Sequence, residues 1–149
     1  MRVLGIVEKK IVAGILCSYM LILGIPPAVL ASDISGVNPT VIDGKNVYNI
    51  EGAKFSGSTQ FRQYTNFNLT DGEIANLIYK IGYDKFINLV NNQVNIKGIV
   101  NTMRDNNFYN GHAIFVSPGG VVIGASGILN VGALSLLTPS QKSFADFKN

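Results

Sequence analysis

The sequence predicts an all-β fold, a parallel β-helix (β-solenoid) in which short strands are joined at corners. The first observation is the stretch 114–132, IFVSPGGVVIGASGILNVG, where three short apolar runs alternate with breaks of Ser, Pro, Gly and Ala. The runs have strand length and many β-branched residues, and this density of Gly and Pro excludes a helix. They are too short and too uniformly apolar for hairpins with one face in water, whereas coils of three short strands explain both properties. The second observation is that three triplets with apolar first and third residues begin at Val94, Ile114 and Leu134, and this even spacing is of the order of length of one β-helical turn.

The amino end is predicted to be a signal peptide over residues 1–31. Three basic residues come before an uncharged, mostly apolar run over 11–25, and after Pro26-Pro27 the small residue Ala31 stands at the predicted cut. This pattern is typical of a chain that is exported by the Sec machinery and cut by signal peptidase, here between Ala31 and Ser32. The alternative is a membrane anchor, which Pro26 and the preceding Gly disfavour because a spanning helix needs ~20 consecutive apolar residues.

The composition of the exported part restricts the classes of function that it can have. The single cysteine, Cys17, lies in the predicted leader, so the mature chain would form no disulfide. An exported protein with a small core usually uses disulfides, so their absence sets this chain apart from such proteins. Without the leader the chain keeps nine basic and eight acidic residues, and this balance excludes the basic patch that a nucleic-acid partner requires. About 118 residues remain, which is the length of one domain.

Between the leader and the first clear coil the pattern indicates two strands and one ambiguous segment. Residues 46–50 alternate between polar and apolar types, and residues 60–69 place their large apolar side chains on one parity. Residues 70–81 allow two interpretations. Thr70 and Glu73 have the spacing of a capping box before a helical apolar face, yet the same residues also fit a strand.

Further along, the apolar runs predict strands near 94–96, 114–116, 121–123, 128–131 and 134–137. The polar stretch 103–112 is expected to be a loop that projects from a corner. Ser117 to Gly120 fits a type II turn, since Pro118 presets φ and Gly119 tolerates the positive φ of the third position. Asn is abundant, and Asn side chains accept left-handed corners and can stack in ladders along a coil axis.

The stretch 114–132 resembles the amino-terminal secretion domain of two-partner secretion exoproteins, the filamentous-haemagglutinin type of adhesin (haemagglutination activity domain). That family shows an apolar strand, an Asn-Pro-Asn-Gly turn, an apolar strand ending in Gly, and a Leu-Asn-Val-Gly-like strand. The matching positions are Phe115-Val116, Ser117 to Gly120, Gly124 and Leu129 to Gly132. Residues 93–101 look like the preceding coil of the family, and the resemblance covers residues 67–140. Ser117 and Gly119 depart from the two Asn residues of the family turn.

The resemblance implies a fold, a partner and a location. It implies a right-handed β-helix whose mature amino end, residues 32–69, is a cap, followed by the first coils over 70–149. It implies an outer-membrane transporter of the two-partner type as the partner, and a secreted or cell-surface location reached through a Gram-negative-type periplasm. The sequence stops soon after a coil with no capping element evident, so the domain is expected to be incomplete. A host receptor or glycan would then be bound by the remainder.

The candidate recognition residues lie in two stretches, 117–120 and 88–98, with two more positions in the last coil. They are Ser117, Pro118, Gly119, Gly120, Asn88, Asn92, Asn95, Gly98, Asn130 and Gly132. For each residue taken alone, shaping a corner is the simpler role.

No catalytic, cofactor or metal constellation is predicted, and the chain is not expected to be an enzyme. His112 is the sole histidine, and its polar surroundings indicate an ordinary exposed residue. The alternative function is a secreted β-helical protein that binds or cleaves carbohydrate. Aromatic residues are available for it, but Asp105 is the one acid between Val94 and Leu137, which counts against cleavage.

Overall fold

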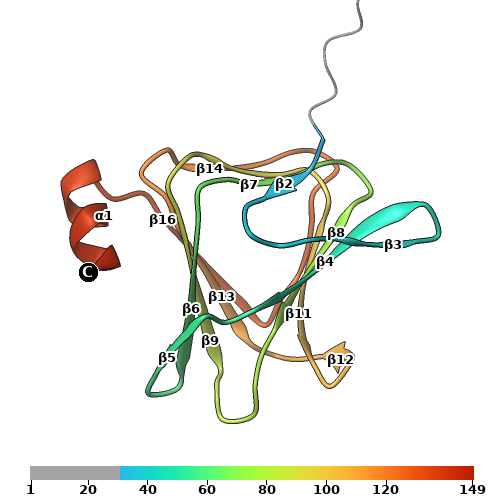
Figure 1. Ribbon diagram of the computed structural model, residues 1–149, viewed down its shortest axis with the longest axis horizontal. Coiled ribbons are helices and arrows are strands. Elements are labelled where there is room, and N and C mark those ends of the chain that lie inside the picture. The colour runs from blue at the N-terminus through green and yellow to red at the C-terminus, as the bar shows by residue number, and fades with distance from the viewer. Residues whose placement is uncertain (1–30) are drawn as a thin grey trace, which may run out of the picture. The chain divides into compact units, whose positions relative to one another are not determined.

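The computed structural model describes residues 31–149, so the predicted leader, apart from Ala31, lies outside the described residues. Three sheets form the three sides of a triangular coil (Figure 1). Sheet 1 contains β4 (Lys45–Glu51), β8 (Ile74–Ile78), β11 (Ile99–Arg104) and β15 (Ile128–Asn130). Sheet 2 contains β6 (Thr59–Tyr64), β9 (Lys85–Val90), β13 (His112–Val116) and β16 (Ala133–Leu137). Sheet 3 contains β7 (Phe67–Leu69), β10 (Val94–Ile96) and β14 (Val121–Ile123).

The chain visits sheets 1, 2 and 3 in turn, so each coil is stacked in parallel on the one before it. Three coils are complete, and β15 and β16 begin a fourth. This confirms the predicted parallel β-helix and the predicted strands of the last two coils. Parallel strands need a crossover of a dozen or more residues, and here the other two sides of the triangle provide it.

The period of the coil is longer than the spacing of the apolar triplets predicted. Val94 pairs with both Phe67 and Val121, so one turn of sheet 3 runs from Phe67 to Val94 and the next from Val94 to Val121. Val94 and Ile114 do not occupy equivalent positions, because they lie in sheets 3 and 2. The last interval in sheet 2 is shorter, since His112 pairs with Ala133. The preceding interval is longer because it contains a hairpin over residues 103–108, and the last interval has no such hairpin.

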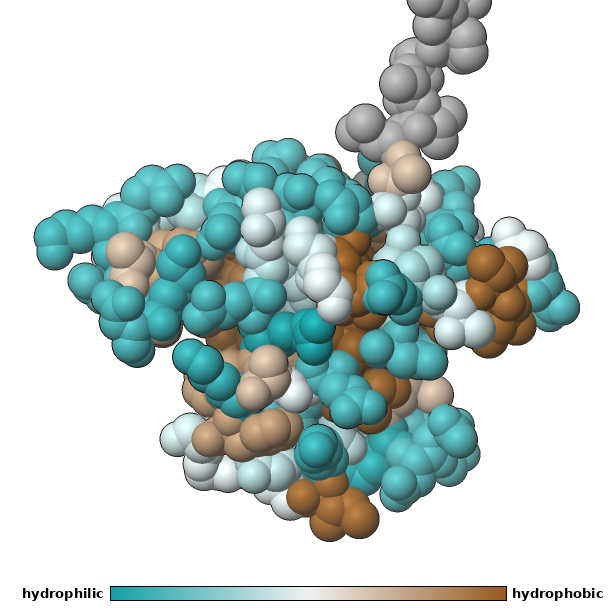
Figure 2. All heavy atoms as spheres, viewed as in Figure 1, coloured by the Kyte–Doolittle hydropathy of each residue, from teal (hydrophilic) through white to brown (hydrophobic). Residues whose placement is uncertain are grey.

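Three short strands pair antiparallel with the outer edge of the first coil. They are β2 (Asp33–Ile34) on β7, β3 (Thr40–Ile42) on β4 and β5 (Lys54–Ser56) on β6. The β3–β4 hairpin turns at Asp43 and Gly44, whose φ values of 51° and 76° fit a two-residue type I′ turn. Figure 2 shows apolar side chains exposed on this hairpin, where Val41 is 67% exposed. The coils thus begin at Lys45, inside the range 32–69 that the resemblance assigned to the cap.

The structure decides one open interpretation of the sequence and corrects another. Residues 74–78 form strand β8, which settles the ambiguous segment in favour of the strand. Residues 103–112 are not a loop, because β11 runs to Arg104 and turns back as β12 (Asn107–Phe108) in a hairpin. Both central residues of that turn, Asp105 and Asn106, have positive φ, which Asp and Asn tolerate better than other side chains.

The interior of the coil is filled by the inward-facing side chains of the three sheets. Phe67 and Phe115 lie edge to face with ring centroids 5.1 Å apart, and Tyr79 and Phe86 do so at 5.7 Å. All four side chains are at most 1% exposed. Burial of each such ring contributes about 2 kcal/mol before packing terms are added, so these two aromatic pairs are a main source of stability.

The chain ends in helix α1 (Gln141–Lys148), which the sequence interpretation did not predict. Ser140 caps its first turn, because the Ser140 hydroxyl accepts a hydrogen bond from the Ser143 backbone N–H. Phe144 packs against Leu89 and Val116 on the outer face of sheet 2. The helix lies beside β16 in Figure 1 and covers a side of the coil. Among residues 31–149 no helix is long and apolar enough to cross a membrane.

Candidate recognition corner

Five of the ten predicted recognition residues, Asn92 and Ser117 to Gly120, lie at the corner between sheets 2 and 3. We call the set Asp33, Asn66, Asn92 and Ser117 to Gly120 the stacked corner. Each member follows a sheet 2 strand or, for Asp33, lies on the outer edge of sheet 3. Because successive coils turn at the same place, residues from different coils come to lie one above another.

Hydrogen bonds join the stacked corner from coil to coil. The Asn66 amide donates to the Asp33 carboxylate at 2.9 Å, and the Asn92 amide donates to the Asn66 side-chain oxygen at 2.7 Å. One coil further, the Ser117 hydroxyl donates to the Asn92 backbone carbonyl at 2.7 Å. The Lys148 ammonium of α1 reaches the neighbouring Asn91 at 3.1 Å. The corner is therefore a continuous polar column with its amide groups at the surface.

The turn at Ser117 to Gly120 is closed by a hydrogen bond but is not of type II. The Gly120 N–H donates to the Ser117 carbonyl at 3.1 Å, and the Ser117 hydroxyl accepts from the Gly119 N–H at 3.1 Å. The positive φ of 88° belongs to Gly120, whereas Gly119 does not adopt one. Gly119 is required for a different reason. A β-carbon there would lie 2.7 Å from the Gln93 backbone nitrogen of the coil beneath.

The remaining predicted residues lie elsewhere, and the structure does not bring them to the corner. Asn88 is fully buried, where its side-chain oxygen accepts from the Tyr64 hydroxyl at 2.7 Å and its amide donates to the Ile114 carbonyl at 3.2 Å. Gly98 and Gly132 lie at the other two corners. A β-carbon at Gly98 would come within 2.6 Å of the Thr70 carbonyl oxygen, so Gly98 has a packing role.

Asn95 and Asn130 belong to two amide ladders on the outer faces of the sheets. On sheet 3 the Asn95 amide donates to Asn68 at 2.9 Å. On sheet 1 four side chains form a ladder with amide-to-oxygen distances of 2.8 to 2.9 Å, and its members are Asn49, Asn76, Asn101 and Asn130. Sequence reasoning expected ladders but did not identify Asn49, Asn66, Asn68 or Asn76. Their spacing was the available signal, because Asn68 and Asn95 are separated by one full turn of sheet 3.

Burial raises the pKa of two core phenols and so keeps both neutral. Desolvation raises the pKa of Tyr64, which the nearby Arg62 partly opposes, and desolvation also raises the pKa of Tyr79. On the surface, a hydrogen bond from Ser58 lowers the pKa of Asp84. None of these groups belongs to the stacked corner, whose exposed side chains include the Asn92 amide and the Asp33 carboxylate.

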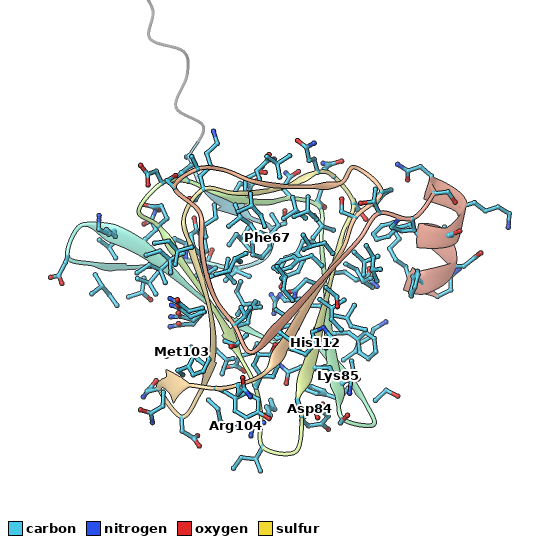
Figure 3. The ribbon with its side chains drawn as sticks, turned by 180° about the vertical axis from the view of Figure 1, so that it is seen from behind. Phe67, Asp84, Lys85, Met103, Arg104 and His112 are labelled. Atoms are coloured by element: carbon cyan, nitrogen blue, oxygen red, sulfur yellow. The ribbon has the colours of Figure 1, made fainter. Side chains whose placement is uncertain are left out.

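His112 lies in a strand and not in a loop. Its Nε2 atom is 2.8 Å from the Ser135 hydroxyl on the outer face of sheet 2. His112 also borders a hollow of about 250 Å³ together with Asp84 and Lys85 (Figure 3). No hydrogen bond joins the His112 ring to a carboxylate within residues 31–149, so a third group that would orient the imidazole is missing. Across the same residues no three metal-ligating side chains gather.

The geometry of the stacked corner suits recognition by hydrogen bonding. The chain matches no family model, no curated protein and no solved structure.

Proposed function

We propose that this chain is the secretion-targeting domain of an exported adhesin-like exoprotein and that a partner outer-membrane transporter recognises it. The observation that carries the proposal is the position of the β-helix in the chain. Its first coil strand begins at Lys45, shortly after the predicted cleavage site between Ala31 and Ser32. A leader followed by a capped β-helix is what the resemblance to two-partner secretion domains implies.

The stacked corner is the proposed contact region, with Asn92 as its central side chain. Asn92 is exposed and lies between Asn66 below and the Ser117 turn above. A transporter that reads the folded corner would form hydrogen bonds with its exposed side chains, and Asn92 at the centre would give specificity. Buried Asn88 then serves the fold alone.

The test compares Asn92→Ala with Asn49→Ala during export. Both side chains are exposed, and each forms one side-chain hydrogen bond to an Asn of a neighbouring coil, so the two changes should cost similar stability. The domain is co-expressed with its candidate transporter, and its amount is measured in the medium and in the periplasm. We expect Asn92→Ala to lower the secreted fraction while Asn49→Ala does not.

Two outcomes would contradict the proposal in different ways. If secretion follows thermal stability across both variants, the stacked corner is not read by the transporter. If the unaltered domain reaches the medium in cells that lack any transporter, the two-partner assignment itself is wrong.

A second candidate function, carbohydrate binding, is favoured by a hollow on sheet 1. This hollow of about 590 Å³ lies between β15 and β12, and its lining includes the amides of Asn101 and Asn130 and the ring of Phe108. Phe108 is 59% exposed. Amide groups beside an exposed ring offer the hydrogen bonds and the apolar face that a sugar uses. Binding of the purified protein to a glycan array, lost in Phe108→Ala, would support this function.

A further inference from the structure

The last coil of the β-helix ends in a face that nothing in residues 31–149 covers. We call this face the open end, and it consists of β14, β15 and β16 with their inward-facing side chains. Within the described residues each of these strands pairs with one neighbour only, on the side of the preceding coil. Figure 3 views the molecule from the side of this coil. Three unpaired strand edges therefore face the same way.

Equivalent positions in successive coils show how much apolar surface is uncovered. Ile96 is fully buried, but Ile123, which pairs with it in β14, is 38% exposed. Phe115 is fully buried, but Leu136, which pairs with it in β16, is 42% exposed. These inward-facing side chains would be covered by one more layer of strands, as their partners Ile96 and Phe115 are in the preceding coil.

The chain itself does not supply that layer among the described residues. After Leu137 it leaves sheet 2 and enters α1, whose Phe144 packs against Leu89 and Val116 on the outer face of that sheet. The helix thus covers the side of the coil, while the open end points along the coil axis.

The open end also lacks the charges that usually protect an exposed sheet edge. Residues 113–141 contain no Asp, Glu, Lys or Arg. Edge strands are normally blocked by charged side chains, especially Lys, or by Pro. A second open end could therefore approach this one without charge repulsion and without burying an unpaired charge.

The opposite end of the coil is built differently, which decides how two copies can meet. There β2, β3 and β5 already pair with the first coil, and Asp33 and Lys54 lie in these strands. Head-to-tail stacking would need an open end to pair with this occupied and charged edge. Contact between two open ends displaces no strand, and the resulting two-fold assembly is closed once two copies have met.

We propose that the open end binds the open end of a second copy of this chain and forms a closed two-fold dimer. A two-fold axis perpendicular to the coil axis reverses strand direction, so the edges of the two copies meet antiparallel. With the axis through sheet 3, β14 pairs with β14 of the other copy, and β15 meets β16. The interface would complete the hydrogen bonding of three edges and cover Ile123 and Leu136.

Sedimentation equilibrium on the product purified from cells expressing the full chain tests the proposal. We expect a dimer at about 10 µM, a concentration at which a weak to moderate interface is occupied. Leu136→Lys should raise the dissociation constant at least about tenfold, because it places a charge in an apolar interface. Val41→Lys is the matched control, since Val41 is apolar and exposed but lies at the other end of the coil. Circular dichroism would establish that both variants keep the β fold.

A crosslink gives a second measurement that does not depend on the folding of Leu136→Lys. Val122 is the central residue of β14 and 43% exposed, so the proposed axis brings it next to its own copy. In a Cys17→Ala background, Val122→Cys should form an intermolecular disulfide on mild oxidation, and Val41→Cys should not. A monomer at all concentrations, an open-ended polymer, or a dimer crosslinked through Val41→Cys would each overturn the proposal.

Discussion

Gly119 and Gly120 are adjacent, but they are required for different reasons, and substitution can separate these reasons. A β-carbon at Gly119 would lie 2.7 Å from the Gln93 backbone nitrogen and 3.0 Å from its α-carbon. At Gly120 no atom lies within 4 Å of that position, but φ is 88°. Position 119 is thus limited by the neighbouring coil, and position 120 by its own backbone.

The expected cost follows from each limit. Gly119→Ala forces two coils apart, and overpacking of this kind costs about 1 to 3 kcal/mol. Gly120→Ala costs about 1 kcal/mol, because an L side chain disfavours positive φ. Asn distinguishes the two positions. It tolerates positive φ, so Gly120→Asn should cost less than Gly120→Ala, whereas Gly119→Asn should cost at least as much as Gly119→Ala, since both add the same β-carbon.

Urea unfolding of the four variants, followed by circular dichroism, measures these differences as shifts in the midpoint. The reasoning would be refuted by a Gly119→Asn variant as stable as the parent protein, or by Gly120→Asn costing more than Gly120→Ala. The first result would mean that the neighbouring coil does not restrict Gly119, and the second that Gly120 does not adopt a positive φ.

Three further predictions use other parts of the structure. Because burial raises the pKa of Tyr64 above its ordinary value of 10.0, the folded state retains a proton that the unfolded state loses. Stability should therefore be constant up to about pH 10 and then fall by up to about 1.4 kcal/mol per pH unit for this group, and Tyr64→Phe should reduce that slope in alkaline urea titrations. Phe144→Ala should destabilise the protein by about 3 kcal/mol, because this ring is 3% exposed, while Phe147→Ala, in the same helix but 55% exposed, should change the urea midpoint little. Mass spectrometry of the exported product should find Ser32 as the first residue, and a retained amino end would favour the anchor.

The strand positions of the last coils were predictable because they depend on local chemistry. The strands coincide with short apolar runs, and flanking Gly, Pro and Ser residues mark where these runs begin and end. The strand 121–123 was predicted to the residue. The same local logic could have found the β3–β4 hairpin, since Asp43-Gly44 is a strong signal for a two-residue turn.

The coil period and the composition of the stacked corner were not predictable in the same way. Apolar triplets look alike whichever sheet they enter, so the interval from Val94 to Ile114 joined strands of different sheets. The position of α1 and the burial of Asn88 depend on contacts between distant segments. The steric limit on a side chain at Gly119 also comes from a neighbouring coil, so the sequence of its own coil does not indicate it.

The parallel stacking has a consequence for how the chain acquires its structure. Each coil strand pairs with one that lies a whole coil away along the chain, as the registers of His112 with Ala133 and Ile99 with Ile128 show. Such nonlocal pairing slows folding, because a large loop must close before any contact forms. Two of the local hairpins, β3–β4 and β5–β6, lie at the amino end and need no such closure. We therefore expect nucleation there and growth coil by coil toward β16, which is the order in which a chain emerging amino end first would present its strands.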